Sequence, residues 1–177
     1  SVVGAQLGSQ AIASSLKAGA IGLAIVMVFM IVMYAVPGIA ASLALAIYTT
    51  LVIATLYLFD ITLTLPGIAG IILGIGMAVD ANVIVFARIR EEIATGKSVQ
   101  TSMKIGFQKA MSAILDGNIT TLIASVVLMA LGSGTVKGFA YTLMIGIILS
   151  LFTAMVVTRY ILYSLYALGL KSEKLYG

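Results

Sequence analysis

Five long apolar stretches dominate this sequence and limit the folds that it can adopt. They cover about residues 16–34, 39–58, 65–86, 116–131 and 139–162. One helix needs about 20 apolar residues to cross the hydrocarbon of a bilayer. Hydrophobic residues make up 62% of the 177 residues, whereas soluble domains contain about 45–50%. We therefore expect an all-α polytopic membrane protein, a bundle of about five transmembrane helices within residues 16–170.

Turn and cap residues separate the apolar stretches. Residues 1–15 are polar or small, and we expect them to lead into the first helix or to lie along the membrane surface. Residues 35–38 contain proline and glycine, so a tight turn there should make the first two helices antiparallel neighbours. Pro66 suits the first turn of the third helix, and Ser98 can cap the next helix.

Residues 87–115 combine charged and apolar positions between the third and fourth spans. Apolar side chains recur there at helical spacing, at Val99, Met103, Phe107, Ala110 and Ile114. This pattern predicts an amphipathic helix in the membrane interface, with a partner-binding helix as the alternative. A polar tail, residues 171–177, follows the last span.

Basic residues are distributed unevenly among the predicted loops. Of the ten lysines and arginines, only Lys17 and Lys137 fall at one end of the predicted bundle. Basic loops remain on the cytoplasmic side, so we expect residues 87–115 and the C-terminus to be cytoplasmic and the N-terminus extracytoplasmic. This rule also accounts for the net charge of +4 without nucleic-acid binding.

Asp80 interrupts the third apolar stretch, where residues 74–92 read GIGMAVDANVIVFARIREE. An aspartate at the centre of a membrane helix costs roughly 2.5–3.5 kcal/mol, and such residues commonly mark ion or proton pathways. We expect an ion pair of Asp80 to need a basic residue from a loop or from another chain. Two roles stay open: a proton- or ion-binding group, or an internal partner, for example of Asn82, that holds the bundle together.

Small residues on the same helix predict close helix packing. Gly70, Gly74 and Gly76 allow neighbouring backbones to approach, so this helix should be central. Because Gly76 and Asp80 lie within about 40° of each other on a helix, we expect the carboxylate to face a crevice that the glycine opens.

Polar residues also begin the fourth span. Asp116, Asn118 and Thr120 belong to the run DGNITT. They extend a polar path toward Asp80, or they cap and pack a short helix whose dipole favours an aspartate at its N-terminus. Asp60 lies in a loop, and we expect it to be solvated.

Charged residues close the third helix. We expect a cluster at the cytoplasmic interface, formed by Arg88, Arg90, Glu91 and Glu92. Within it, the i,i+4 spacing predicts that Arg88 pairs with Glu92.

Several classes of site lack the residues that they need. The chain contains no cysteine and no histidine, so thiolate catalysis and cysteine or histidine metal sites are excluded. An intramembrane aspartate protease needs a second intramembrane aspartate, which is missing here, so this class is excluded. A nucleotide-binding site is also excluded, because the closely spaced glycines lie within the third span rather than at a strand-to-helix turn. We expect a transport component, with no catalytic residues, cofactor or metal.

Several motifs in order resemble one known family. Three stretches closely resemble the C-terminal membrane region of the SecD family. In chain order they are VVGAQLGSQAIASSLKAG, LPGIAGIILGIGMAVDANVIVFARIREE and ILDGNITTLIASVVLMALGSGTVKGFAYTLMIGIILSLFTAMVVTR. SecD is a protein-export subunit of the resistance–nodulation–division superfamily. The resemblance covers nearly the whole chain.

The resemblance implies a fold, partners and a mechanism. The chain would be half of a resistance–nodulation–division-type transmembrane domain without its first helix and extracytoplasmic domain, in a bacterial or archaeal cytoplasmic (inner) membrane. It would pair with SecF, fused or separate, beside the SecYEG channel, and use the proton-motive force to move polypeptide. Asp80 would carry the proton, assisted by Asp116, Asn118, Thr120 and charged residues of SecF. Two alternatives are an assembly scaffold without a proton role and a small-molecule exporter of the same superfamily.

Overall fold

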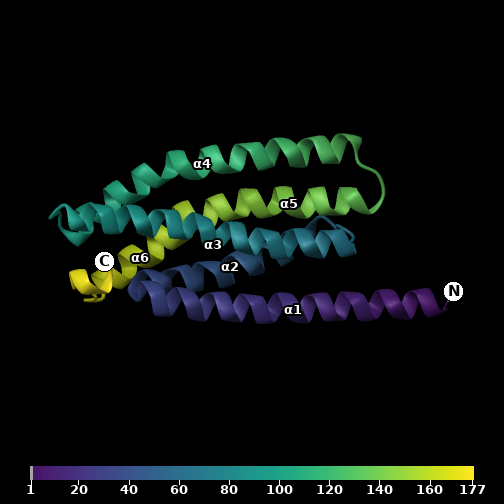
Figure 1. The fold of residues 1–177 in the computed structure, drawn as a ribbon, viewed down its shortest axis with the longest axis horizontal. Helices are drawn as coiled ribbons and strands as arrows, with labels where there is room; N and C mark the ends of the chain where they lie inside the picture. Colours follow the sequence, from purple (N-terminus) through teal and green to yellow (C-terminus); the bar gives the residue numbers. More distant parts are fainter. Residues whose placement is uncertain (1) are drawn as a thin grey trace.

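The predicted helical bundle is confirmed in a computed structural model. It describes residues 2–177, with all of their side chains except those of residues 2, 3 and 5. The α-helices are α1 (Val2–Tyr34), α2 (Val36–Leu58), α3 (Leu65–Ala94), α4 (Val99–Leu131), α5 (Thr135–Phe152) and α6 (Thr158–Ala167). Within the described residues, five helical segments are long and apolar enough to cross a membrane, with α5 and α6 forming one of them. α3 contacts α1, α2, α4 and α5 and lies among them (Figure 1).

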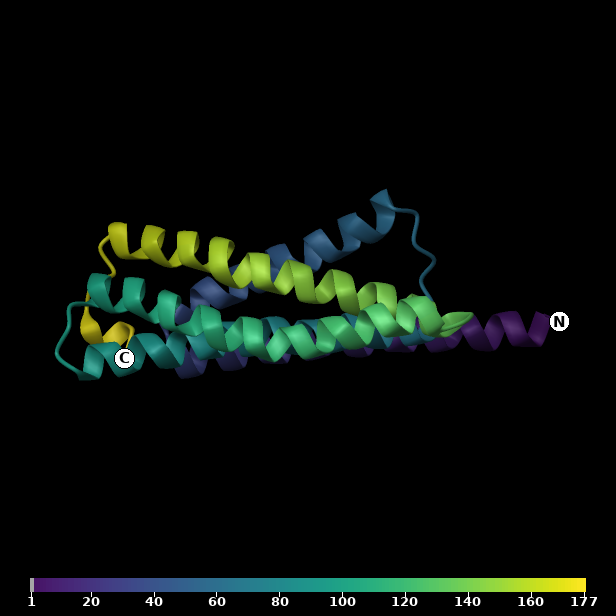
Figure 2. The same ribbon diagram turned by 90° about the horizontal axis from the view of Figure 1, so that it is seen from above.

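The loops define two ends of the bundle. The Asp60 end holds the loops after α2 and α4, and the Glu92 end holds the α1–α2 turn, the α3–α4 loop and the C-terminus (Figure 1). α2 diverges from its neighbours toward the Asp60 end (Figure 2).

The first helix begins earlier than expected, because α1 continues through residues 2–15 instead of starting near Leu16. Residue 1 lies outside the described residues. The following turn is also tighter than predicted: Ala35 alone, with φ 51°, separates α1 from α2. Gly38 lies inside α2 against the Met30 carbonyl, where a Cβ would collide with backbone. Its role is close helix approach rather than an unusual dihedral angle.

Side-chain caps begin the next two long helices, of which the Ser98 cap was predicted, as was Pro66 in the first turn of α3, and the Thr64 cap was not. The Thr64 hydroxyl accepts a hydrogen bond from the Gly67 amide at 3.0 Å, with Pro66 in the first turn of α3. The Ser98 hydroxyl accepts one from the Thr101 amide at 3.3 Å. Each cap satisfies an amide that has no partner within its helix.

The amphipathic segment is the first half of α4, which continues without a break into the fourth span. Its apolar side chains Met103, Phe107 and Ala110 are buried in a core shared with Phe86 and Ile89 of α3. The amphipathic face thus packs onto α3, and Asp116 lies inside a helix rather than at a helix start.

Gly106 sits where α4 crosses α3, and we expect Gly106→Ala to destabilise the full-length protein. An added Cβ would lie 2.9 Å from the Ile89 amide nitrogen and 3.1 Å from its Cα, and overpacking of this kind costs about 1–3 kcal/mol. Gly117, on the same helix, has nothing within 4 Å, so Gly117→Ala should gain up to about 1 kcal/mol from helix propensity. Thermal unfolding in detergent measures both, and equal effects would contradict the packing.

A π-helical turn, Thr153–Val157, joins α5 to α6 within the fifth span. The tail then folds back: Tyr176 is buried in the core at the Glu92 end, and its hydroxyl donates to the Leu170 carbonyl. Burial raises the pKa of Tyr176 to about 12, so the hydroxyl keeps its proton. Residues 171–177 therefore include a packed anchor as well as exposed polar groups.

Candidate functional site

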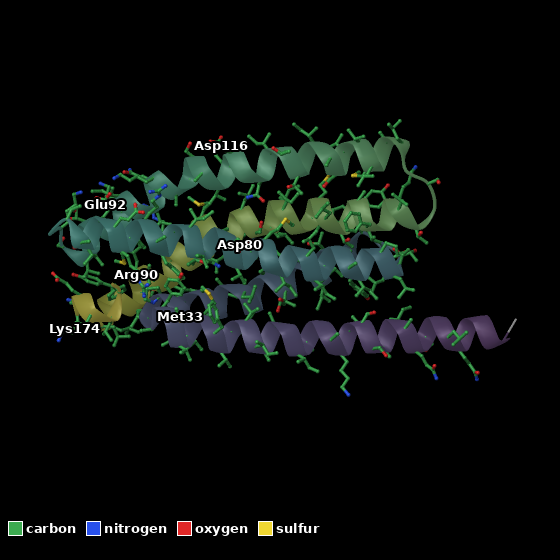
Figure 3. All side chains as sticks on the ribbon, in the orientation of Figure 1. Met33, Asp80, Arg90, Glu92, Asp116 and Lys174 are labelled. Carbon is green, nitrogen blue, oxygen red and sulfur yellow. The ribbon has the colours of Figure 1, made fainter. Side chains whose placement is uncertain are left out.

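Asp80 lies near the middle of α3 (Figure 3), on a stripe of exposed residues of that helix. Asp80, Ala69, Gly76 and Ala87 are all exposed in the described structure and lie within about 40° of one another at 100° per residue. Buried Ala78, Asn82 and Ile89 lie on the opposite side of α3. The described chain therefore packs one side of α3 and leaves the carboxylate side open.

Asp116 lies at the same level of the bundle as Asp80. α3 and α4 are antiparallel and meet at Ile89 and Gly106. Asp116 follows Gly106 on α4 by the same number of residues as Val79 precedes Ile89 on α3. Asp116 therefore lies level with Val79 and Asp80, as Figure 3 shows for Asp80. Asp116 is exposed on the side of α4 away from α3. Two carboxylates therefore share one depth without facing each other across a closed site.

The other polar residues of the predicted path have separate surroundings. The Asn118 amide donates to the Ile114 carbonyl of its own helix at 2.7 Å, and Thr120 is exposed. Asn82 is buried, donates to the Ala78 carbonyl at 3.1 Å and accepts from the Thr158 hydroxyl at 2.8 Å. The suggested Asp80–Asn82 pair is wrong, because Asn82 turns toward α6.

The π-helical turn begins at the depth of Asp80, a feature that the sequence pattern did not reveal. α3 and α5 run parallel, with Gly67 beside Gly138 and Gly74 beside Gly146. Extending this register places Asp80 level with residue 152, next to the turn Thr153–Val157. Single π turns occur frequently at functional sites, and the Asn82–Thr158 hydrogen bond ties this one to α3.

The predicted packing glycines separate into two groups. Cβ atoms at Gly70 and Gly74 would collide with the Thr142 and Tyr48 hydroxyls, so these glycines lie at crossings with α5 and α2. Gly76 has nothing within 4 Å. Gly76 and Asp80 therefore open onto the surroundings of the chain rather than onto a crevice within it.

The charged cluster at the Glu92 end has a different pairing from the predicted one. Arg88 pairs with Glu91 at 2.8 Å, with both side chains largely exposed. Glu92 is 2% exposed and forms salt bridges with Lys97 and Lys109. The predicted Arg88–Glu92 pair is wrong, and Glu92 instead links the α3–α4 loop and α4 to α3.

Arg90 joins α1 to α3 at the same end. Its Nη2 donates to the Met33 carbonyl at 3.0 Å, and its guanidinium lies 4.7 Å from the Tyr34 ring centroid. A cation is favourable beside the last carbonyls of a helix. Arg159, the basic residue inside the fifth predicted span, lies 5.8 Å from each of the Phe107 and Tyr163 rings. Arg90 and Arg159 thus have these partners at the Glu92 end, away from the level of Asp80.

We expect Glu92→Gln to lower the melting temperature of the full-length protein by several degrees, because it removes the carboxylate that binds two lysines while leaving a buried polar group. Glu91→Gln is the matched control: Glu91 is the next residue, its one partner is exposed, and exposed pairs contribute little. Thermal unfolding in detergent compares the two. Equal melting temperatures would contradict a structural role for the buried cluster.

The described residues contain no group of three acidic side chains that could hold a metal ion.

Known proteins resemble this chain in sequence and in fold. The family model for the protein export membrane protein SecD/SecF, C-terminal, matches residues 1–167. Protein translocase subunit SecD of Synechocystis sp. is 55% identical over 160 residues, which cover 90% of this chain and 34% of that protein. The same subunit of Acidaminococcus fermentans is 52% identical over 160 residues, covering 90% and 38%.

One solved structure has the same fold. The crystal structure of SecDF, a translocon-associated membrane protein from Thermus thermophilus, matches with a TM-score of 0.86 and 36% identity, covering 89% of this chain and 22% of that one. The chain thus spans about a third of the length of the two SecD relatives. It belongs to the SecD/SecF family of protein-export membrane proteins and corresponds to the C-terminal transmembrane region of SecD.

Proposed function

We propose that this chain is the membrane part of a SecD-type export subunit that couples the proton-motive force to polypeptide translocation. Asp80 carries the proton, and the subunit works with SecF, fused or separate, and with the SecYEG channel. The observation that carries the proposal is the position of Asp80: an ionisable residue at mid-span, on an otherwise apolar stripe that the described chain leaves open.

The open stripe supports a partner subunit beside Asp80. A carboxylate facing lipid at this depth is costly, whereas a second helix bundle can supply hydrogen-bond donors or a cation. Ala69, Gly76 and Ala87 are small and would let a partner helix approach closely. The Thermus relative is named SecDF, and we assign the SecF half to this face.

Protonation provides the coupling step. A proton on Asp80 removes a charge from apolar surroundings, which changes the packing that the partner favours, and release of the proton restores it. The membrane potential supplies about 2.3 kcal/mol per elementary charge per 100 mV, enough to shift a balance between two helix packings. The π turn at this level and the Asn82–Thr158 bond join the Asp80 region to α6.

Membrane vesicles that contain the full complex test the coupling. Translocation of a precursor protein is measured with an imposed proton gradient and after a protonophore collapses it. We expect faster translocation with the gradient than without it. Vesicles that lack the subunit should lose the part of this acceleration that depends on the subunit. A rate that is independent of the gradient in complete vesicles would overturn the proposal.

The open stripe also fits an assembly scaffold, in which Asp80 serves only as a hydrogen-bond partner between subunits. Co-purification separates the two roles. If Asp80→Asn dissociates the partner subunit, the scaffold is favoured; if the complex stays intact and proton-dependent export stops, the proton role is favoured.

A further inference from the structure

A crevice of about 540 Å³ lies between α1, α2 and the first half of α3. α2 diverges from its neighbours toward the Asp60 end (Figure 2), where Tyr57 and Asp60 line the crevice. Leu23, Ile68, Ile71 and Ile75 belong to its mainly apolar lining. Asp80 and the other residues of the proposed proton site do not line it.

The dimensions of the crevice match one leaflet of a bilayer. Its lining on α1 runs from Ser15 to Leu23, a rise of about 12 Å at 1.5 Å per residue, against about 15 Å for half of the hydrocarbon thickness. Water gains no hydrogen-bond partners from aliphatic side chains. An acyl chain suits this lining in length and in polarity.

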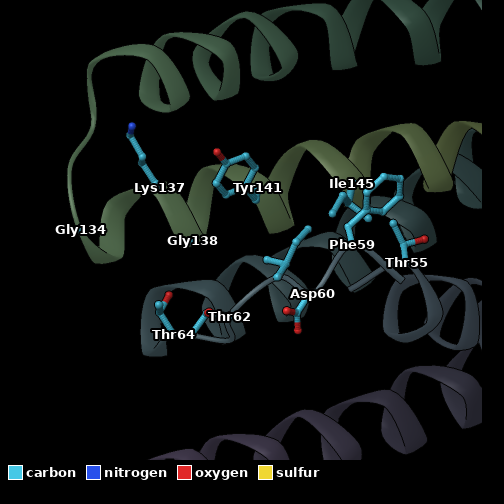
Figure 4. A pocket seen from close by; sticks show the side chains of 11 residues that line it. Thr55, Phe59, Asp60, Thr62, Thr64, Gly134, Lys137, Gly138, Tyr141 and Ile145 are labelled. Atoms are coloured by element: carbon cyan, nitrogen blue, oxygen red, sulfur yellow. The ribbon is translucent and has the colours of Figure 1, made fainter. Parts of the chain in front are cut away.

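One charged group, Asp60, lines the mouth of the crevice. Asp60 has φ 50°, is exposed, and forms no salt bridge within the described residues. It also borders a second pocket of about 640 Å³ that contains Lys137, but its carboxylate points away from Lys137 (Figure 4). A free carboxylate above an apolar crevice is complementary to a cation attached to an acyl chain.

We propose that this crevice binds one phospholipid with an ammonium headgroup, of the phosphatidylethanolamine type. One acyl chain lies along Leu23 and Ile71, and the ammonium group pairs with Asp60. Tyr57, which also lines the crevice, offers its hydroxyl to the phosphate and glycerol region, whereas the Ser15 hydroxyl donates to the Ala11 carbonyl at 2.8 Å. The bound lipid would fill the opening between α1 and α2 and hold α1 against α3.

Photolabelling of the full-length protein with its partner subunit tests this site. The complex is placed in nanodiscs that contain phosphatidylethanolamine with a diazirine on its acyl chain, and labelled peptides are identified by mass spectrometry. We expect labels on residues 15–23 and 68–75. Ala20 lines the crevice, and Ala20→Phe should reduce this labelling about tenfold, because the ring displaces chain methylenes whose burial drives binding.

Two matched variants distinguish specific binding from general contact with the bilayer. Ala18 is exposed and does not line the crevice, so Ala18→Phe should leave the labelling unchanged. Asp60→Asn should abolish an expected preference of about threefold for phosphatidylethanolamine over phosphatidylglycerol, the size that an interfacial ion pair gives.

Three results would overturn the proposal. They are equal labelling in Ala20→Phe and Ala18→Phe, equal labelling by the two lipids in the unmodified protein, and cross-links showing that another helix of the full-length protein fills the crevice.

Discussion

Full-length protein with Asp80→Asn is expected to assemble with its partner subunit and to lose the proton-dependent part of export. Asparagine has nearly the same shape as aspartate and retains hydrogen-bonding groups, so helix packing should survive. It cannot gain or lose a proton, so the coupling step is removed. In vesicles with an imposed gradient, the export rate should fall to the rate that the unmodified complex shows with a protonophore.

Asp116→Asn provides the matched control at the same depth. Asp116 is level with Asp80 but lies on the side of α4 away from α3, so most of the gradient-dependent export should remain. Asp80→Glu keeps the ionisable group and should restore part of the activity. Full gradient-dependent export by Asp80→Asn, with the complex intact, would exclude Asp80 as the proton carrier.

The sequence predicted the features that depend on local residues. Apolar runs of spanning length gave the five long helices, and Pro66 and Ser98 marked where α3 and α4 begin. Capping and hydropathy depend on residues that are close together in the sequence, so both can be read from it. The sequence did not predict that the segment before Leu16 is helical, because its small and polar residues tolerate a helix without a clear signal for one.

Features that depend on tertiary contacts were missed. The i,i+4 rule linked Arg88 to Glu92, but Lys97 and Lys109 approach Glu92 from the loop and from α4, and this pairing follows only from how α4 packs. The hydrogen bond between Asn82 and Thr158 joins residues far apart in sequence. Asp80 and Asn82 are close together on one helix, and no local pattern showed that Asn82 is buried and Asp80 exposed.

Helical geometry placed Gly76 beside Asp80 correctly but could not say what lies in front of them. The crevice predicted there needed a second wall, and the described chain supplies none. Its packed helices lie instead on the side of Gly70 and Gly74. Under the proposed function a partner chain covers this surface, and the different surroundings of Gly74 and Gly76 allow a direct test.

Gly74→Leu and Gly76→Leu are expected to act on different properties of the full-length protein. Gly74 lies where a Cβ would overlap the Tyr48 hydroxyl, with the Gly146 Cα 3.6 Å away. Because Tyr48 is fully buried and cannot swing aside, Gly74→Leu should cost at least about 1–3 kcal/mol through overpacking. Gly76 has nothing within 4 Å, so Gly76→Leu should not lower the melting temperature of the subunit and should raise it slightly through helix propensity.

Gly76→Leu should instead weaken association with the partner subunit. If a partner helix lies close to the Asp80 stripe, a leucine there separates the two backbones, because small residues are what permit such an approach. We expect Kd to rise by about tenfold or more, the equivalent of about 1.4 kcal/mol, measured by co-purification at graded detergent dilution. Val32→Ala, on an exposed part of α1, should change neither property. Unchanged association of Gly76→Leu would show that the partner does not cover this stripe, and Asp80 would then face lipid, where a carboxylate cannot be kept charged at low cost.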